Sequence, residues 1–424
     1  MFKKLIQIFK IKDLRRRIFF VLGLLTVFRF AAHIPVPGID AGALKEFFDS
    51  TQVLGLLNML SGGAMKNFSL VALGIGPYIT SSIIFQLLTM IVPKLEELSK
   101  EGESGREKIN NYTRILTAPL AALQGYGMIV LLQRSGRGII GQLSFSQMIT
   151  TIIVMVAGTM FLVWLGELIS EKKIGNGISL IIFAGIVAGV PGMVQQTIVT
   201  FNPGQVTNLI IFAILAVITV AGIVYITEAQ RNIPVSYAKR VRGIRMYGGM
   251  NTYLPLRVNQ AGMIPIIFAI SLILFPPLIA RFFLTAKADW LAYAAQFIIN
   301  IFQNQAIYGI LYFALVVAFT YFYTSIVFHP QQIAENLQKH GGFVPGIRPG
   351  SQTASYITGV SNRIMLAGAL FLGVVAILPI IVQSALGVTT LMIGGASMLI
   401  VVSVVIETVR QINSQLTMRE YEEI

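Results

Sequence analysis

Residues 55–93 read GLLNMLSGGAMKNFSLVALGIGPYITSSIIFQLLTMIVP. A short apolar segment, Leu56–Leu60, is followed by a Ser-Gly-Gly break at 61–63 and then by a long apolar run with glycines and a proline inside it. An apolar piece of about 10 residues is too short to cross a bilayer, which takes about 20 residues. Such a piece can lie at membrane depth only where protein or water surrounds its backbone. The stretch therefore predicts a short plug of chain folded into the interior of a membrane protein, beside an interrupted helix.

The composition supports a membrane location. Of the 424 residues, 55% are hydrophobic and only 12% are charged, whereas soluble domains carry about 25% charged residues. A soluble core could not bury so much apolar surface, so we expect an integral membrane protein. The net charge of +14 is typical of basic cytoplasmic loops that meet anionic lipid or acidic partners. The chain has no cysteine, which excludes disulfides, thiolate chemistry and cysteine metal sites.

Ten apolar runs reach the length of a membrane span, which predicts an all-α polytopic membrane protein with ten transmembrane helices. The first run follows a basic N-terminal segment, 1–17, for which we expect an amphipathic cytoplasmic character. It is too long for the apolar region of a signal peptide and no small-residue cleavage site follows, so we expect a retained helix. The runs lie at 18–34, 70–92, 113–133, 147–168, 178–200, 207–228, 261–283, 306–328, 364–384 and 389–407.

The distribution of basic residues predicts the orientation. Of the 32 lysines and arginines, 25 fall in one alternate set of connections, which includes both termini. One further residue, Arg29, lies within the first span. Both termini are therefore predicted to be cytoplasmic, as an even number of helices also requires. The minority set consists of Lys45, Lys66, Arg134, Arg137, Arg281 and Lys287.

Two cytoplasmic loops, at about 229–260 and 329–363, are long, basic and rich in glycine and proline. One interpretation is that they serve only as topology signals. Their length favours a functional surface instead, because topology needs only a few charges near the helix ends. The turn-forming pairs Gly248-Gly249 and Pro345-Gly346 suggest defined protrusions.

The chain shows a trace of internal symmetry. Gly74–Ile84 reads GIGPYITSSII in the second span, and Gly262–Leu272 reads GMIPIIFAISL in the seventh. In two halves of five helices, 18–205 and 206–408, these positions are equivalent, and the odd number makes the halves inverted. Paired interruptions of this kind point to a central pathway, although glycine and proline are common in membrane helices. A cytoplasmic tail, 409–424, completes the expected organisation.

Catalysis is not indicated. Intramembrane chemistry needs paired carboxylates, or a nucleophile with a base, inside the spans. The aspartates fall in loops or flanks, the three histidines are far apart, and neither a metal-ligand spacing nor a P-loop motif occurs. We therefore expect no enzyme activity, no metal and no cofactor, so any energy from nucleotides must come from a partner.

An ion-coupled secondary transporter of a small solute is the alternative function. Such carriers usually place ionisable groups near the bilayer midplane. Here Glu167, Glu228 and Glu407 lie at the cytoplasmic ends of their spans. We interpret Arg29 as a snorkelling or helix-paired structural residue. The lack of midplane carboxylates counts against a proton- or sodium-driven carrier.

The chain resembles the SecY/Sec61-alpha family of protein-conducting channels, through motifs spread in order over nearly its whole length. The motifs that carry the resemblance are Ile34–Gly38 (IPVPG), Phe68–Gln86 (FSLVALGIGPYITSSIIFQ), Lys100–Arg106 (KEGESGR), Gly175–Gly185, Gln230–Arg240, Ala261–Phe268 (AGMIPIIF), Phe343–Gly350 (FVPGIRPG) and Leu399–Glu407.

The resemblance implies two inverted halves around an hourglass pore, closed by an aliphatic ring and a plug at about 56–67. The implied pore ring consists of Ile75, Ile79, Ile178, Ile182, Ile267 and Ile400. The implied plug includes Leu57, Leu60, Ser61, Gly62, Gly63, Ala64 and Met65. Taken alone, the isoleucines would be ordinary lipid-facing or core residues. In a ring they would form a constriction that resists water and ions yet makes no specific hydrogen bond with what passes.

A lateral gate is implied between helices two and three and helices seven and eight, through which an apolar signal sequence would leave into lipid. The gate candidates are Thr80, Ile83, Gln86, Gln124 and Phe275. Thr80, Ser81, Gln86 and Gln124 would supply polar contacts across the gate, or serve as ordinary helix–helix contacts.

The resemblance also implies partners. These are the small membrane subunits SecE and SecG, the cytosolic motor ATPase SecA, the ribosome, and signal peptides and unfolded preproteins, in the bacterial inner membrane. Ribosomal RNA contact by the basic loops is the one nucleic-acid contact expected. Relatives often carry two adjacent arginines where this chain has Ile244-Arg245. The resemblance assigns the motor or ribosome contact to one arginine of the 329–363 loop and to basic residues of the 229–260 loop. These are Arg348, Lys239, Arg240, Arg242 and Arg245.

Overall fold

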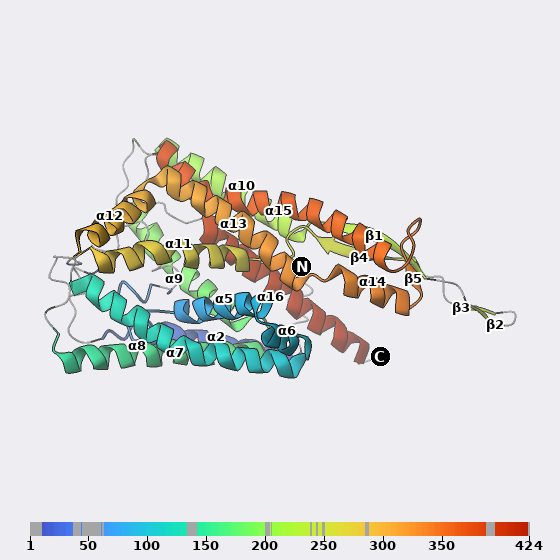
Figure 1. The fold of residues 1–424 in the computed structure, drawn as a ribbon, viewed down its shortest axis with the longest axis horizontal. Helices are drawn as coiled ribbons and strands as arrows, with labels where there is room; N and C mark the ends of the chain where they lie inside the picture. Colours follow the sequence, from blue (N-terminus) through green and yellow to red (C-terminus); the bar gives the residue numbers. More distant parts are fainter. Residues whose placement is uncertain are drawn as a thin grey trace. The chain divides into compact units, whose positions relative to one another are not determined.

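The computed structural model describes residues 11–36, 44, 61, 63–133, 141, 143–199, 204, 206–237, 240–242, 245–247, 251–284, 288–386 and 395–422. The protein is predominantly helical (Figure 1), which confirms the predicted fold class. Seven helices in this part of the chain are long and apolar enough to cross a membrane, and a bent pair makes an eighth. The seven are α7 (Glu103–Gln133), α8 (Phe145–Glu171), α9 (Gly177–Val199), α10 (Val206–Glu228), α13 (Gln305–Val327), α15 (Ser351–Leu386) and α16 (Gly395–Glu422).

Helices also cover most of the remaining predicted spans, and the chain divides into two compact units. The further helices are α2 (Lys12–Ala31), α5 (Gly76–Ile91), α6 (Pro93–Lys100) and α11 (Ile264–Phe283). Unit 1 comprises Met1–Gln205, Ser271–Gln305 and Val388–Ile424, and unit 2 comprises Val206–Ile270 and Ala306–Gly387. The predicted halves, 18–205 and 206–408, stay a prediction.

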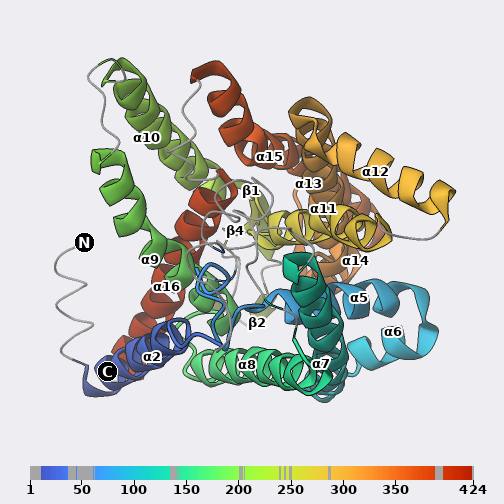
Figure 2. The same ribbon diagram turned by 90° about the vertical axis from the view of Figure 1, so that its left-hand side faces the viewer.

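The second span begins later than the sequence predicts. Residues 70–75 form turns, and α5 starts only at Gly76, with Pro77 in its first turn. Gly74 has a φ of +58°, a left-handed conformation that a residue with a side chain rarely adopts. This turn and Pro77, which suits a first helical turn, delay the helix. At its other end α5 meets α6 with a bend of 101°, which Figure 2 shows.

In unit 1, α7 packs against both α5 and α8. The core between them contains Ala121, Met128 and Ile129 of α7 and Met155 of α8. Small residues let these elements approach closely: a Cβ added to Gly158 of α8 would lie 1.9 Å from the carbonyl oxygen of Leu70. The core of unit 1 is therefore built around the chain that precedes α5.

At the turn between α8 and α9, the two helix ends approach each other even more closely. A Cβ added to Gly177 would lie 1.8 Å from the carbonyl oxygen of Gly166. The Ser170 hydroxyl donates to the Gly166 carbonyl at 2.9 Å, and the backbone N–H of Gly177 donates to the Ser170 oxygen at 2.9 Å. Asn176 precedes the start of α9 at Gly177, and the Ser179 N–H donates to the Asn176 side-chain oxygen at 3.2 Å.

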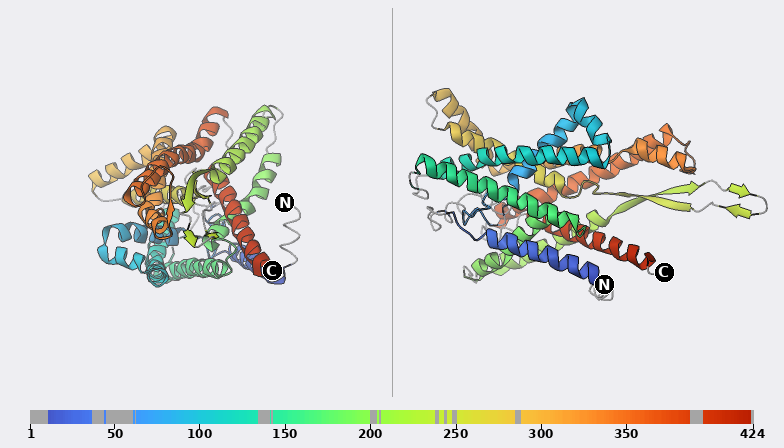
Figure 3. Two further views of the ribbon diagram at one scale, coloured as in Figure 1. Left: turned by 90° about the vertical axis from the view of Figure 1, so that its right-hand side faces the viewer. Right: turned by 90° about the horizontal axis from the view of Figure 1, so that it is seen from below.

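Unit 2 is a bundle of α10, α13 and α15 joined to a small sheet. A Cβ on Gly373 of α15 would lie 2.6 Å from the Phe313 ring of α13, so glycine sets the distance between these helices. The sheet has the strand order β4-β1-β5, with β1 at Gln230–Tyr237, β4 at Asn251–Arg257 and β5 at Gly342–Phe343. Figure 3 (right) shows β1 and β4 as a long antiparallel pair.

The two long basic loops, at 229–260 and 329–363, are more regular than the sequence predicts. The loop at 329–363 contains α14 (Pro330–Lys339), and its residues from Ser351 onward belong to α15, so the predicted start of that span at 364 is wrong for the helix. The helix continues because 351–363 contains neither a proline nor a glycine pair that would stop it. In the loop at 229–260, β1 and β4 form an antiparallel hairpin. Between them in the sequence lies a short two-stranded ribbon, β2 (Arg240–Arg242) paired with β3 (Arg245–Tyr247).

The sequence pattern does not predict α12 (Asp289–Gln303), which lies between the seventh and eighth predicted spans. Its 15 residues fall below the length of a span, so a search for spans passes over it.

Candidate functional site

The segment that precedes α5 is irregular and buried. Ser61, Ala64, Met65 and Phe68 are all buried, while Gly63 and Phe68 have φ values of +82° and +39°. The Met65 N–H donates to the Ser61 hydroxyl at 3.2 Å, and the Ser69 N–H donates to the Ala64 carbonyl at 3.1 Å. The predicted plug residues Ser61, Gly63, Ala64 and Met65 thus lie in a compact turn, whereas Leu57, Leu60 and Gly62 lie outside the described residues.

The end of the first span holds this segment in place. The Val36 N–H donates to the Phe68 carbonyl at 2.9 Å, and the Leu70 N–H donates to the Ile34 carbonyl at 3.0 Å, around a bridge between Pro35 and Ser69. Irregular chain is tolerated inside a membrane protein only when protein or water satisfies its backbone groups. The IPVPG motif therefore supplies hydrogen-bond partners to the turns before α5.

Apolar contacts anchor the same segment to the helices of unit 1. Met65 and Phe68 belong to the buried cluster that includes Val36, Met128 and Met155. The described part of the predicted plug, at 61 and 63–67, is thus non-helical and packs beside the delayed start of α5, whereas the apolar segment at 56–60 lies outside the described residues.

The six isoleucines of the predicted ring lie on four helices. Ile75 is the residue that caps α5, and Ile79 lies one turn later; Ile178 and Ile182 are on α9, Ile267 is on α11 and Ile400 is on α16. All except Ile178 are between 1% and 6% exposed, whereas isoleucines such as Ile153 and Ile218 are 61% exposed. The five are therefore interior residues and not lipid-facing ones.

Ile178 has a different setting. It is half-buried, and its Cδ1 would lie 2.7 Å from a Cβ added to Gly166 of α8. Its side chain thus packs toward the α8–α9 turn. Ile267 belongs to unit 2 and the other five isoleucines belong to unit 1, so the closed ring stays a prediction.

The gate candidates on α5 and α7 lie near one another. The Gln124 side-chain oxygen of α7 is 3.9 Å from the position of a Cβ on Gly76, at the start of α5. Thr80 donates back to the Gly76 carbonyl at 3.1 Å, and Ile83 is buried. The Gln86 amide donates to Ser82 at 3.3 Å, while its buried oxygen has no partner among the described residues. Phe275 lies within α11.

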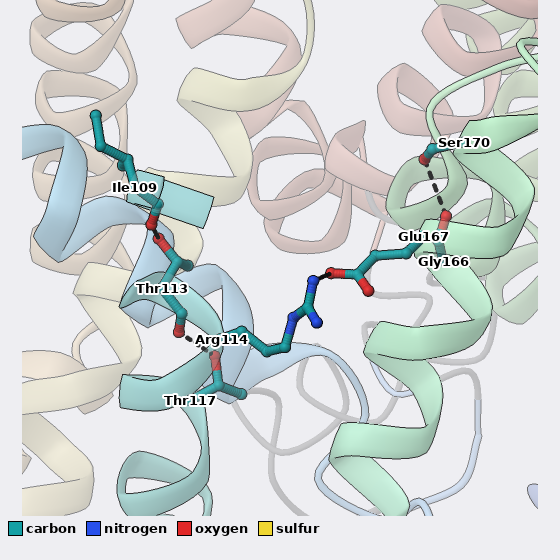
Figure 4. A network of polar contacts seen from close by, with 7 residues as sticks. All are labelled: Ile109, Thr113, Arg114, Thr117, Gly166, Glu167 and Ser170. Atoms are coloured by element: carbon teal, nitrogen blue, oxygen red, sulfur yellow. Dashed lines mark hydrogen bonds and ion pairs between the residues drawn. The ribbon is translucent and has the colours of Figure 1, made fainter. Parts of the chain in front are cut away.

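Two polar contacts tie α7 to its neighbouring helices, and sequence reasoning did not predict either pairing. The Ser81 hydroxyl of α5 donates to the Thr113 carbonyl of α7 at 2.7 Å, and Thr117 donates to the same carbonyl at 2.7 Å. Arg114 forms an ion pair with Glu167 of α8, with 2.8 Å between Nη2 and Oε1 (Figure 4). Ser81 therefore makes the helix–helix contact that was one of its two interpretations.

The candidate partner surface is built from both long basic loops. Arg348 is exposed in the turn between β5 and α15, where the Thr353 hydroxyl donates to its carbonyl at 2.9 Å. Arg240, Arg242 and Arg245 lie on the β2–β3 ribbon, in which Arg242 pairs with Arg245. Lys239 lies outside the described residues.

A small apolar core fixes the base of this surface. Ile233 of β1, Leu256 of β4, Val344 beside β5 and Ile357 of α15 are buried together. Gly342 allows a close β1–β5 contact, because a Cβ there would lie 3.0 Å from the Tyr237 ring. The two loops thus form one folded platform, as their turn-forming pairs suggested.

Groups of three or more histidine, aspartate or glutamate side chains able to hold a metal do not occur in the described part of the chain.

Comparison with known proteins identifies relatives over almost the full length. A family model described as SecY matches residues 69–409. The chain is 43% identical to the protein translocase subunit SecY of Streptomyces scabiei, over 98% of this chain and 97% of the relative. It is 44% identical to that of Halalkalibacterium halodurans, over 99% of each, and 43% identical to that of Vibrio cholerae, over 98% and 94%.

Solved structures share the fold. One described as "The structure of a protein conducting channel" gives a TM-score of 0.64 at 18% identity, over 93% of this chain and 90% of that chain. Another, of Sec61 in the canine ribosome-channel complex, gives a TM-score of 0.61 at 18% identity over the same shares. Together with the apolar helices, the sequence matches show that this multi-pass membrane protein belongs to the SecY family.

Proposed function

We propose that the chain forms a protein-conducting channel, which passes unfolded secretory polypeptides across the membrane and releases apolar segments sideways into lipid. The observation that carries this proposal is the buried, irregular segment at 61 and 63–75, packed among α7 and α8 and bonded to residues 34–36. Irregular backbone at membrane depth usually serves a pathway, since a simple bundle has no need of it. A relative of the same fold is described as having a plug domain that stabilises the closed state and maintains a membrane seal.

The isoleucines fit a seal for such a channel. A pathway for chains of any sequence cannot rely on specific polar contacts, because each contact would favour some sequences and hinder others. Aliphatic side chains close dry when the pathway is empty and form no hydrogen bond with a passing chain. Ile75, Ile79, Ile182, Ile267 and Ile400 are buried, whereas isoleucines such as Ile153 of α8 and Ile218 of α10 are 61% exposed, which supports an interior role.

A lateral gate between α5 and α11 would let apolar segments leave. Burial of apolar surface in lipid supplies the driving force for that exit. On one side of the gate, Ser81 ties α5 to α7 and Arg114 ties α7 to α8. These bonds support movement of α5 and α7 as one body.

The cytoplasmic platform is the proposed docking surface for the motor ATPase SecA and the ribosome, in a complex with SecE and SecG in the bacterial inner membrane. Its arginines are cations suited to acidic proteins or ribosomal RNA. The excess of basic residues supports cytoplasmic termini. A structure of the same fold is described as part of a ribosome-channel complex.

The test uses the absence of cysteine in the chain. Single cysteines at Ile75, Ile178 and Ile400 would be crosslinked to a secretory polypeptide arrested midway. Cysteines at Ile153 and Ile218, which are 61% exposed, serve as controls. Crosslinks at the three ring positions and none at the controls are expected. Equal or absent crosslinking at all positions would overturn the proposal, and accumulation of a solute against a gradient by the purified chain would favour the transporter instead.

A further inference from the structure

The helix α12 has two opposite faces of different character. Trp290, Tyr293 and Phe297 are 71%, 78% and 59% exposed. Residues spaced by three and four positions share one side of an α-helix. The three rings therefore form a single ridge, here called the aromatic ridge, along the outward side of α12.

The other face of α12 is fixed to its own unit. Ala295 and Ile299 are 3% and 6% exposed and form a buried cluster with Ala280 of α11. At 100° per residue these two positions point away from the aromatic ridge. The ridge is thus held in a defined direction by packing on the opposite side, and its exposure is not a result of a loose helix.

The surroundings of α12 identify what covers the ridge. The helix follows α11 and precedes α13, at the end of α11 opposite the 229–260 loop. Ile279 of α11 is 41% exposed, as an apolar side chain on the lipid-facing side of a span would be. The ridge continues this membrane-facing surface from α11, to which α12 is packed.

Length and charge place α12 along the bilayer surface and not across it. A helix of 15 residues is about 22 Å long, shorter than the hydrocarbon core of about 30 Å. Its one charged residue, Asp289, is at the start of the helix, and it contains no lysine or arginine. Tryptophan and tyrosine prefer the level of the lipid headgroups, with apolar rings inward and polar groups outward.

We propose that α12 is a membrane-surface helix whose aromatic ridge inserts among the headgroups of phospholipids at the outer end of α11. Because the ridge carries no positive charge, insertion depends on apolar and aromatic contact and not on anionic lipid. This inference is independent of the proposed channel function, since it concerns only how α12 meets the bilayer.

The experiment uses intrinsic fluorescence, because the chain has only two tryptophans. Trp164→Phe leaves Trp290 as the sole emitter in the full chain, reconstituted into phosphatidylcholine vesicles. Some vesicles would carry lipids brominated near the headgroup and others lipids brominated near the end of the acyl chain. We expect headgroup-level bromine to lower Trp290 emission about twofold more than deep bromine, as interfacial tryptophan requires. Acrylamide in the water should have little effect.

Other outcomes would overturn the inference. Strong quenching by acrylamide with none by either bromolipid would show that the ridge lies in water. Dominant quenching by the deep bromine would show that α12 is buried in the hydrocarbon core. Trp290→Phe, which leaves the lipid-exposed Trp164 of α8, is the control that verifies reconstitution.

A second copy of the chain is the remaining occupant to test. Tyr293→Cys introduces a single cysteine on the ridge, so an oxidant would form a disulfide between two copies if their ridges faced each other. No disulfide-linked dimer is expected in dilute vesicles. Efficient dimer formation, together with protection of Trp290 from both quenchers, would replace lipid by protein as the occupant.

Discussion

Arg114 of α7 and Glu167 of α8 form an ion pair that links two membrane helices, with 2.8 Å between Nη2 and Oε1. The two side chains are partly exposed, and the preceding carbonyl, that of Thr113, accepts the Ser81 hydroxyl from α5. Three helices of unit 1, α5, α7 and α8, are therefore joined by polar contacts within one turn of α7.

The contribution of the ion pair can be measured by a double-mutant cycle. Arg114→Ala and Glu167→Ala should each lower the thermal stability of the purified protein, and the coupling free energy should be at most about 1 kcal/mol, because the pair is partly exposed. The pair of Arg17 with Asp13, at 3.0 Å and similarly exposed but within one helix, is the control, for which a coupling of about 0.3–0.5 kcal/mol is expected. Additive single effects at 114 and 167 would show that the pair does not hold α7 to α8.

The approach of α8 to α9 gives a sharper prediction on stability. Gly177→Ala places a Cβ 1.8 Å from the Gly166 carbonyl oxygen, so the helices must move apart, at a cost of about 1–3 kcal/mol for overpacking. Gly189→Ala in the same helix meets nothing within 4 Å and should be neutral or stabilising by up to about 1 kcal/mol. Thermal unfolding in detergent measures both. Equal midpoints would contradict the close approach.

Polar substitutions in the predicted ring should loosen the seal. Ile79→Thr and Ile182→Thr place hydroxyl groups where dry aliphatic contacts are expected, and water can then enter a hydrophobic constriction more easily. Ion conductance of the reconstituted complex should rise several-fold. Ile153→Thr, at a lipid-exposed site of α8, should leave conductance unchanged. If every ring variant conducts like the parent, the ring assignment is wrong.

Charge reversal at Arg348 separates docking from folding. Arg348→Glu should reduce motor- or ribosome-coupled translocation several-fold, because an exposed cation of the platform becomes an anion. Membrane insertion of the channel should remain normal, since the side chain is outside the buried cluster of Ile233 and Ile357. Lys94→Glu, an equal charge change at an exposed residue of α6 outside both loops, is the control. Normal translocation by the Arg348 variant would refute its role.

The sequence predicts those features that depend on local pattern. Apolar runs locate the membrane helices, and the glycines and proline at 74–77 predict an interrupted second span. The turn before α5 is nevertheless longer than a hydropathy window indicates, because residues 70–75 are as apolar as the helix that follows. Hydropathy measures burial and does not distinguish a buried turn from a buried helix.

Features that depend on distant partners could not be predicted in the same way. Glu167 and Arg114 each look like ordinary residues at a helix end, and only the packing of α7 against α8 pairs them. The β1–β5 contact joins Tyr237 to Gly342, a pairing for which neither loop alone provides a signal. The apolar buried face and the aromatic exposed face of α12 can be recognised only if its 15 residues are considered as a helix in their own right and not as a span that is too short.

The strand order of the platform has a mechanical consequence. β1 pairs with β4 through seven residue pairs, from Gln230–Arg257 to Ser236–Asn251, but with β5 through only two. Under a pulling force the short β5 clasp would unzip first, while the long hairpin stayed intact. A partner that binds the hairpin and pulls on it would therefore separate β1 from β5 first. Arg348 and its loop would be released at low force, while β1 and β4, which transmit the force, stay paired.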